Sequence, residues 1–248
     1  MINTSFLHFK GIGKANLKII SEFGITTWFD VLDNIEKIPF NEKKKTDLVS
    51  EIEFCIQKLE QDDLEFFSNK LHPKEKWKVL EENFSRACFF DIETNGQNYG
   101  DNITLIICYY KNRVYQFLNG DNLDSFLDFL EDVKLLVSFN GTSFDIPMIK
   151  NYFRIPKLEI AHIDLRWLSY QIGLKGGLKK IETKLGIKRS DSIDGLNGLD
   201  AIYLWIEWKN YGNRNSLEKL IEYCTQDVIS LEILAKKILE ISKLEAKR

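Results

Sequence analysis

Apolar residues recur at helical intervals through the first 60 residues of the chain. One such set holds these positions: Leu17, Ile20, Phe23, Trp28, Val31 and Leu32. Glycines at Gly11, Gly13 and Gly24 mark turns, and residues 41–59 form one amphipathic helix by the same periodicity. The pattern predicts a small all-α domain over residues 1–60.

A polar segment over residues 61–82 interrupts this pattern. It carries Pro73 with charged neighbours, and a proline in polar surroundings favours a break between elements. We therefore expect a linker here and a second domain over residues 83–248.

Short apolar runs replace the helical pattern after Arg86. Residues 87–90 form a continuous apolar run, as a strand buried on both faces does. Two further runs, at 104–110 and 113–117, flank a Lys-Asn pair in the spacing of a β-hairpin. The three runs predict three strands.

The second half of the chain returns to helices. A helix over 122–130 leads to two more strands, at 135–139 and 158–165, and then to a helical remainder. The last helix covers 216–244, and Asn215 with Glu218 has the spacing of a capping box. This order predicts an α/β fold, a mixed sheet flanked by helices, after the small all-α domain.

Composition narrows the class of protein. The chain has 248 residues, of which 44% are hydrophobic and 29% charged, as in an ordinary globular protein. Its four cysteines are scattered, which favours a reducing compartment and no zinc site. No apolar run approaches the ~20 residues of a membrane helix, and the start lacks the apolar stretch of a signal peptide. We expect a cytoplasmic protein without membrane association.

The net charge is −3, from 34 basic and 37 acidic residues. Proteins that bind nucleic acid usually have a basic footprint. A cluster of acids that binds cations would itself contribute negative charge. A nucleic-acid enzyme with this balance must therefore group its basic residues locally.

Carboxylates border predicted core elements at three places. Asp91 and Glu93 come directly after the first strand, and residues i and i+2 of a strand share a face. Asp145 follows the fourth strand in an apolar setting, and Asp227 lies four residues after Tyr223 on one face of the last helix. Each acid alone also fits a solvated strand end or a helix cap. The three places together indicate a shared site.

Four converging carboxylates repel one another in a poorly solvated site unless cations neutralise them. Hard oxygen ligands suit Mg²⁺ or Mn²⁺ better than zinc. Two such ions about 3.5–4 Å apart can clamp the attacking and leaving oxygens of a phosphoryl displacement. The acids therefore predict a site for two divalent ions, in which the tyrosine one turn before Asp227 could orient the attacking water.

Three motifs resemble those of the tyrosine-type DEDD exonucleases: D-x-E after the first strand, N-G-x-x-F-D after the fourth, and Y-x-x-x-D in the last helix. The stretches HIDLRWLSYQIGLKGGLKKIETKLGI and DGLNGLDAIYLW resemble the YprB-type ribonuclease H-like family in particular. The resemblance covers residues 84–240. Cys224 departs from that family, which more often has asparagine at this position, but the position is not a ligand.

The resemblance implies a ribonuclease H-like fold and 3′→5′ hydrolysis of phosphodiester bonds. It implies that Asp91, Glu93, Asp145 and Asp227 are the metal ligands. It places Tyr223 near the nucleophilic water.

A basic run between residues 175 and 189 contains one acid, Glu182, and these basic residues: Lys175, Lys179, Lys180, Lys184, Lys188 and Arg189. Lys180 and Lys184 share one face of a predicted helix. The run could follow a phosphate backbone, with Gly176 and Gly177 allowing close approach, or it could be a solvated helix face. We take Lys175, Lys179 and Lys180 as candidate nucleic-acid contacts, together with Asn140 of the second motif.

The N-terminal segment FKGIGKANLKIISEFGITTWFDVL resembles a helix-hairpin-helix element. In that motif a glycine hairpin presents backbone N–H groups to DNA phosphates. Gly11, Gly13 and Lys14 would take this role here. A purely structural hairpin fits the same residues.

The sequence thus favours a metal-dependent nuclease, a 3′→5′ exonuclease acting on DNA or RNA by a two-metal mechanism. A non-catalytic nucleic-acid binding module on the same fold is one alternative, although a scaffold has no need of all four acids. A phosphohydrolase of small phosphate esters is another, and it predicts no dependence on a polymer. No motif indicates a protein partner.

Overall fold

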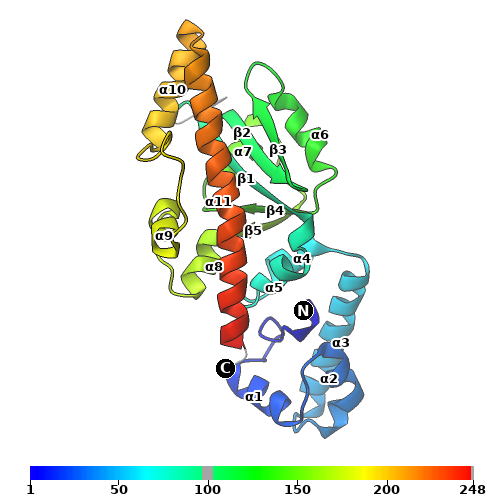
Figure 1. Ribbon diagram of the computed structural model, residues 1–248. Helices are drawn as coiled ribbons and strands as arrows, with labels where there is room; N and C mark the ends of the chain where they lie inside the picture. The colour runs from blue at the N-terminus through cyan, green and yellow to red at the C-terminus, as the bar shows by residue number, and fades with distance from the viewer. Residues whose placement is uncertain (97–102, 247–248) are drawn as a thin grey trace. The chain divides into compact units, whose positions relative to one another are not determined.

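The computed structural model describes residues 1–96 and 103–246, and the chain divides into two compact units, Met1–Phe84 and Ser85–Arg248 (Figure 1). No helix within the described ranges is both long enough and apolar enough to cross a membrane. Short 3-10 helices occur at Ile2–Thr4, before the first α-helix, and between later elements at Ile35–Lys37, Phe84–Arg86 and Leu123–Ser125.

The first unit is all-α, as the helical periodicity predicts. Its helices are α1 (Lys14–Glu22), α2 (Trp28–Asn34), α3 (Glu42–Glu60), α4 (Leu64–Lys70) and α5 (Trp77–Glu82). Trp28 is fully buried, and its indole N–H donates to the Ser5 carbonyl oxygen at 2.6 Å. Thr27 caps α2 with its side chain, and Asn41 caps α3 in the same way.

The segment 61–82, expected to be a linker, is instead folded into α4 and α5 within the first unit. Leu64, Phe67 and Leu71 are buried and lie at helical intervals. Charged residues on the outer face of these helices gave the segment its polar composition. Burial of the inner face, rather than average polarity, decides the structure here.

The second unit is built on a five-stranded mixed sheet, which confirms the predicted architecture. Its strands are β1 (Ala87–Thr94), β2 (Ile103–Tyr110), β3 (Arg113–Leu118), β4 (Leu135–Ser138) and β5 (Ala161–Asp164), in the order β3-β2-β1-β4-β5. The first three strands pair antiparallel, whereas β4 is parallel to both β1 and β5. Lys111 and Asn112 both have positive φ (49° and 61°), as a tight two-residue hairpin requires.

Helices cover both faces of this sheet (Figure 1). On one face α6 (Phe126–Leu130) and α7 (Asp145–Tyr152) pack against a core that includes Cys88, Phe90 and Ile106. On the other face the long α11 (Arg214–Ala246) runs across β1 and β2. Along the chain, three further helices follow β5 and precede α11: α8 (Leu165–Gln171), α9 (Leu178–Leu185) and α10 (Gly198–Tyr211).

The expected capping box at the start of the last helix is wrong. Helical hydrogen bonding begins earlier, with the Leu217 N–H donating to the Asn213 carbonyl, so Asn215 lies inside α11. A capping box forms instead at α10. There Asn197 and Asp200 exchange side-chain and backbone hydrogen bonds.

Candidate active site

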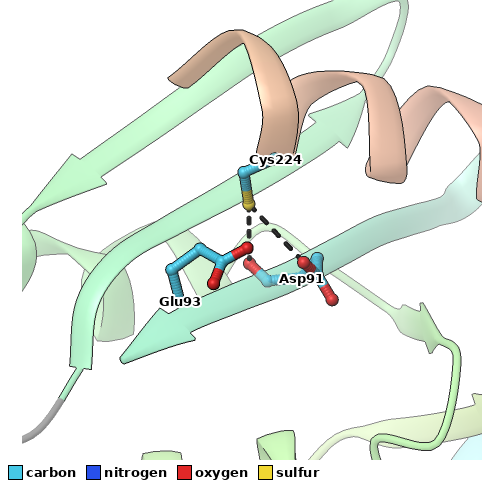
Figure 2. A group of neighbouring side chains, drawn as sticks. All are labelled: Asp91, Glu93 and Cys224. Atoms are coloured by element: carbon cyan, nitrogen blue, oxygen red, sulfur yellow. Dashed lines mark hydrogen bonds between the residues drawn. The ribbon is translucent and has the colours of Figure 1, made fainter. Parts of the chain in front are cut away.

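Asp91 and Glu93 extend from the end of β1 toward α11. Alternation along the strand sends Phe90 and Ile92 into the core on one face, so the two acids emerge on the other. Figure 2 shows both carboxylates beside Cys224, whose Sγ lies 3.6 Å from Asp91 Oδ2 and 3.9 Å from the Asp91 backbone oxygen. Ligand atoms of Asp91, Glu93 and Cys224 lie within 4.8 Å of one another, close enough to share a metal ion.

The turn between β4 and α7 is held tightly. Asn140 has a left-handed backbone conformation (φ 69°), and a Cβ on Gly141 would lie 2.0 Å from the Ser138 hydroxyl oxygen. Glycine is therefore the residue that fits there. The Asp164 carboxylate accepts hydrogen bonds from two backbone N–H groups of the turn, at 2.7 and 3.1 Å.

This turn delivers Asp145 to the strand end that carries the other two acids. Asp145 is the first residue of α7 and is buried. Its carboxylate accepts a hydrogen bond from the backbone N–H of Ile92, which lies between Asp91 and Glu93. Three carboxylates from two elements thus meet at the end of β1.

Tyr223 and Asp227 complete the group from α11, where four-residue spacing puts them on one helical face. Both are buried, and both line a cavity of about 560 Å³ together with Asp91 and Glu93. The rest of the lining comes from Phe139, Gly177, Leu178, Lys179, Lys180, Arg189, Asn197 and Gly198. The cavity therefore joins the acids to the start of the basic run.

The acids destabilise one another's charged forms. Burial raises the pKa of Asp91 well above its usual value, and the charges of Asp145, Asp227 and Glu93 raise it further. Burial, followed by the charges of Asp227 and Asp145, raises the pKa of Glu93 to about 8. Burial is also the main cause that raises the pKa of Asp145 to about 7.

Burial and the charges of neighbouring acids both make the ionised carboxylates unfavourable in the absence of a cation. A divalent cation would supply positive charge, and carboxylate oxygens are the donors that Mg²⁺ and Mn²⁺ prefer. The donor set of Asp91, Glu93, Asp145 and Asp227 therefore fits a divalent ion. The Cys224 thiol does not add to this charge, because burial raises its pKa well above the usual value and keeps it protonated.

Arg189 is the one basic residue of the predicted run that pairs directly with these acids. Its Nε and Nη2 atoms donate to the two carboxylate oxygens of buried Glu182, at 2.9 and 3.0 Å. Nη2 also forms an ion pair with Asp227. Burial raises the pKa of Asp227 to about 6, while the charge and hydrogen bond of Arg189 act in the opposite direction.

Tyr223 has two cations near its ring at the cavity wall. The Nζ of Lys179 is 5.1 Å from the centre of its ring, and the guanidinium carbon of Arg189 is 5.8 Å away. Burial and the nearby acids raise the pKa of Tyr223 far above its usual value, so its hydroxyl keeps its proton at neutral pH. The Lys179 ammonium also donates to the Leu196 carbonyl oxygen.

A family model described as RNase_H superfamily matches residues 88–239, more than half of the chain. The chain belongs to the RNase_H superfamily. Among solved structures, the family B DNA polymerase from the hyperthermophilic archaeon Pyrobaculum calidifontis is similar, with a TM-score of 0.50 and 18% identity. The match covers 62% of this chain and 24% of the polymerase chain, and it supports the fold alone. No curated protein matches the chain in sequence.

Membership of the RNase_H superfamily supports a nuclease-type function and contact with nucleic acid. RNase H-like nucleases typically use divalent metal ions, and the close group of Asp91, Glu93 and Cys224 is a possible place for one. The superfamily match includes Asp145, Tyr223 and Asp227 as well. It therefore spans every predicted member of the acidic site.

The structure separates the candidate nucleic-acid contacts of this RNase_H domain into three groups. Lys179 and Lys180 line the cavity. Lys175 does not, and its Nζ lies 4.7 Å from the ring centre of Tyr170 on α8. Asn140 is in the turn before Asp145, where its side-chain oxygen accepts from Arg166. The basic run is thus not one continuous surface, because Arg189 is buried in ion pairs.

Gly11, Gly13 and Lys14 belong to the first unit, outside the RNase_H match. Gly11 has positive φ (73°), and Gly13 is the N-cap of α1, which begins at Lys14. A 3-10 helix at Ile2–Thr4 and turns precede Gly11, where a helix-hairpin-helix element would have its first α-helix. DNA binding by these residues stays a prediction.

The sequence did not indicate the structural roles of Asp164, Glu182 and Arg189. Asp164 fixes the turn before Asp145, while Glu182 and Arg189 form the ion pair beside Asp227. One signal was present, because Glu182 is the single acid in a basic run. Its burial depends on the tertiary position of α9.

Proposed function

We propose that this chain is a metal-dependent nuclease, a 3′→5′ exonuclease of the tyrosine-type DEDD class. The observation that carries the proposal is the meeting of four acids from three separate elements near one strand end, with Asp145 and Asp227 buried and Asp91 and Glu93 partly buried. A purely structural ion pair needs about as many cations as acids, whereas here, within the described part of the chain, four acids have a single guanidinium, that of Arg189, in direct contact with one of them. The RNase_H fold and the three motifs support the same assignment.

The ligands we propose are Asp91, Glu93, Asp145 and Asp227, holding two Mg²⁺ or Mn²⁺ ions. Bound there, divalent ions would supply the positive charge that stabilises the attacking and leaving oxygens of a phosphodiester displacement. The chain's own part is to hold the carboxylates fixed before substrate arrives. The backbone N–H of Ile92 does so for Asp145, and Arg189 does so for Asp227.

Tyr223 is the residue we propose to orient the attacking water. Its hydroxyl stays protonated, so it can donate a hydrogen bond toward the cavity that it lines with Asp91 and Glu93. Lys179, at 5.1 Å from the Tyr223 ring, places a positive charge on the same wall. Lys179 and Lys180 would neutralise the phosphates of the bound strand.

The test is hydrolysis of 5′-end-labelled single- and double-stranded DNA and RNA, with Mg²⁺ or Mn²⁺. The wild-type chain should give ladders that shorten from the 3′ end. Asp91→Asn should lower the rate by at least ~100-fold, because electrostatic stabilisation of this kind is worth several kcal/mol. Internal cuts would contradict the exonuclease polarity. Intact substrates in all metals would contradict the nuclease itself.

A non-catalytic binding module is favoured by one specific observation, the ion pair of Arg189 with Asp227. In that case the guanidinium would replace a metal ion as the partner of the acid. The same assay separates the two functions. A module would bind labelled strands without shortening them, whereas a phosphohydrolase of small esters would cleave p-nitrophenyl phosphate and spare the polymers.

A further inference from the structure

Two aromatic side chains stand exposed on the short helix α8. Trp167 is 51% exposed and Tyr170 is 52% exposed, although Leu165, Leu168 and Ser169 of the same helix are buried. Trp167 and Tyr170 are three residues apart, so they share one face of the helix. A single exposed aromatic residue needs no explanation, whereas two on one helical face form a candidate contact surface.

Each ring has a cation beside it. The Arg166 guanidinium carbon lies 5.9 Å from the Trp167 ring centre, and the Lys175 Nζ lies 4.7 Å from that of Tyr170. Nucleic-acid bases stack on aromatic rings and on guanidinium planes, while the cations attract the phosphates between them. The pairs therefore offer both groups that a nucleic-acid strand needs.

The segment that carries this face is purely basic. Residues 165–181 contain no acid and four cations: Arg166, Lys175, Lys179 and Lys180. In its second half, residues 177–180 line the cavity that contains the acids. In a chain with a net charge of −3 this stretch is charge-complementary to a phosphate backbone. It leads from the aromatic face to the cavity.

Hydrogen bonds of Asp164 and Arg166 connect α8, which carries the two aromatic residues, to the turn before Asp145. The Asp164 carboxylate caps α8 by accepting from the Arg166 backbone N–H at 3.0 Å. It also accepts from the Asn140 N–H at 2.7 Å, and the Arg166 side chain donates to the Asn140 oxygen. The position of α8 is therefore fixed relative to the turn that precedes Asp145.

We propose that Arg166, Trp167, Tyr170 and Lys175 form a stacking platform for the unpaired bases of a single-stranded nucleic acid. The platform receives the strand, whose 3′ end then reaches the acidic cavity along the basic segment. The proposal rests on the proposed nuclease function and adds a substrate class to it, single strands rather than blunt duplexes. Stacking is sequence-tolerant, because every base has an aromatic face.

The test measures binding separately from cleavage. In the Asp91→Asn background, fluorescence anisotropy compares labelled oligothymidylate with an abasic strand of the same length and charge. Trp167→Ala combined with Tyr170→Ala should weaken oligothymidylate binding roughly 10- to 100-fold, since stacking is worth ~1–3 kcal/mol per base. Binding of the abasic strand should change little, because both strands keep their phosphates.

Two further variants guard against misfolding and non-specific effects. Tyr211→Ala removes an aromatic side chain that is 81% exposed at the end of α10, and it should leave both affinities unchanged. Trp167→Phe keeps an aromatic ring and should retain most of the affinity. The Asp91→Asn protein without any change on α8 gives an independent measurement, because it should bind oligothymidylate more tightly than the abasic strand.

Equal losses for both strands, or no loss in a folded double variant, would overturn the platform. In the second case α8 would serve another partner, such as a protein. If the wild-type chain shortens labelled strands while the double variant binds normally, the platform alone fails. If the wild-type chain neither binds nor cuts any strand, the proposed function fails with it.

Discussion

At the scale of single residues, the site brings four acids close together, and the Arg189 guanidinium pairs with one of them, Asp227. Burial is the main cause that raises the pKa of Glu93 to about 8, of Asp145 to about 7 and of Asp227 to about 6, and the charges of neighbouring acids add to it. Arg189 offsets part of this charge at Asp227. We therefore expect the stability of the folded protein to depend on pH and on divalent cations.

The metal-free protein should lose stability as the pH rises from about 4 to about 8. The folded state holds protons on these acids at a pH where the unfolded chain has released them. The stabilisation is therefore complete below the usual carboxyl pKa and is lost as the pH passes through the raised values. Melting temperatures in EDTA across this range measure the effect, with Asp145→Asn as a variant that should flatten it.

Mg²⁺ or Mn²⁺ should reverse this trend above neutral pH, because the ionised acids then bind the cation and binding stabilises the folded state. The melting temperature at about pH 8 should rise with the concentration of added ion. A melting temperature that changes neither with pH nor with added divalent ions would contradict the view that these carboxylates destabilise one another when ionised.

Arg189→Met should destabilise the protein by about 3–5 kcal/mol, because it leaves the buried carboxylate of Glu182 without its partner. Urea unfolding measures the change. The neighbouring Lys188 is exposed, so Lys188→Met should alter the stability by no more than about 0.5 kcal/mol. Combining Arg189→Met with Glu182→Leu should recover part of the loss, since no unpaired buried charge remains on α9.

At the scale of secondary-structure elements, the turn between β4 and α7 decides where Asp145 lies. Gly141→Ala would bring a methyl group against the Ser138 hydroxyl, and we expect a loss of about 1–3 kcal/mol from this overpacking. Binding of Mn²⁺, measured by calorimetry, should weaken because Asp145 moves with the turn. Gly198→Ala is the matched control, since a Cβ there meets nothing within 4 Å. Equal effects of the two changes would contradict the role of the turn.

The strands and the four acids could be predicted because their signals are local. Continuous apolar runs gave β1, β2 and β4, and the acids follow directly from strand ends or share a helix face. The fold then brings these elements together by parallel pairing of β1 with β4. Motif order and strand alternation were therefore sufficient to predict that Asp91, Glu93 and Asp145 lie close together, while their role as metal ligands stays a prediction.

Other features depend on tertiary contacts that no local pattern contains. Arg189 looked like one more cation of a basic run, but Glu182 and Asp227 bury it. Residues 61–82 looked like a linker, but their inner face is covered by the first unit. In both cases the prediction was based on the average charge of a segment, which does not indicate which of its side chains are buried.

At the scale of the whole molecule, the chain joins an all-α unit to the RNase_H domain. If Gly11 presents backbone N–H groups to phosphates, Gly11→Val should weaken binding to duplex DNA about tenfold or more and spare Mn²⁺ binding. Gly24 also has positive φ (71°), so Gly24→Val carries the same backbone strain without the proposed contact. Anisotropy with labelled duplex should separate the two, and equal affinities would reduce the hairpin to a structural element.

We propose that the four carboxylates act as one catalytic site. Asp145 tests it most directly, because it is the acid whose membership depends on the fold of the turn rather than on the close group of Asp91 and Glu93. The measurement is the shortening of a 5′-labelled single strand in Mn²⁺ by Asp145→Asn beside wild type. We expect a loss of at least ~100-fold in rate with the fold intact. Wild-type rates of shortening by a folded Asp145→Asn protein would contradict it.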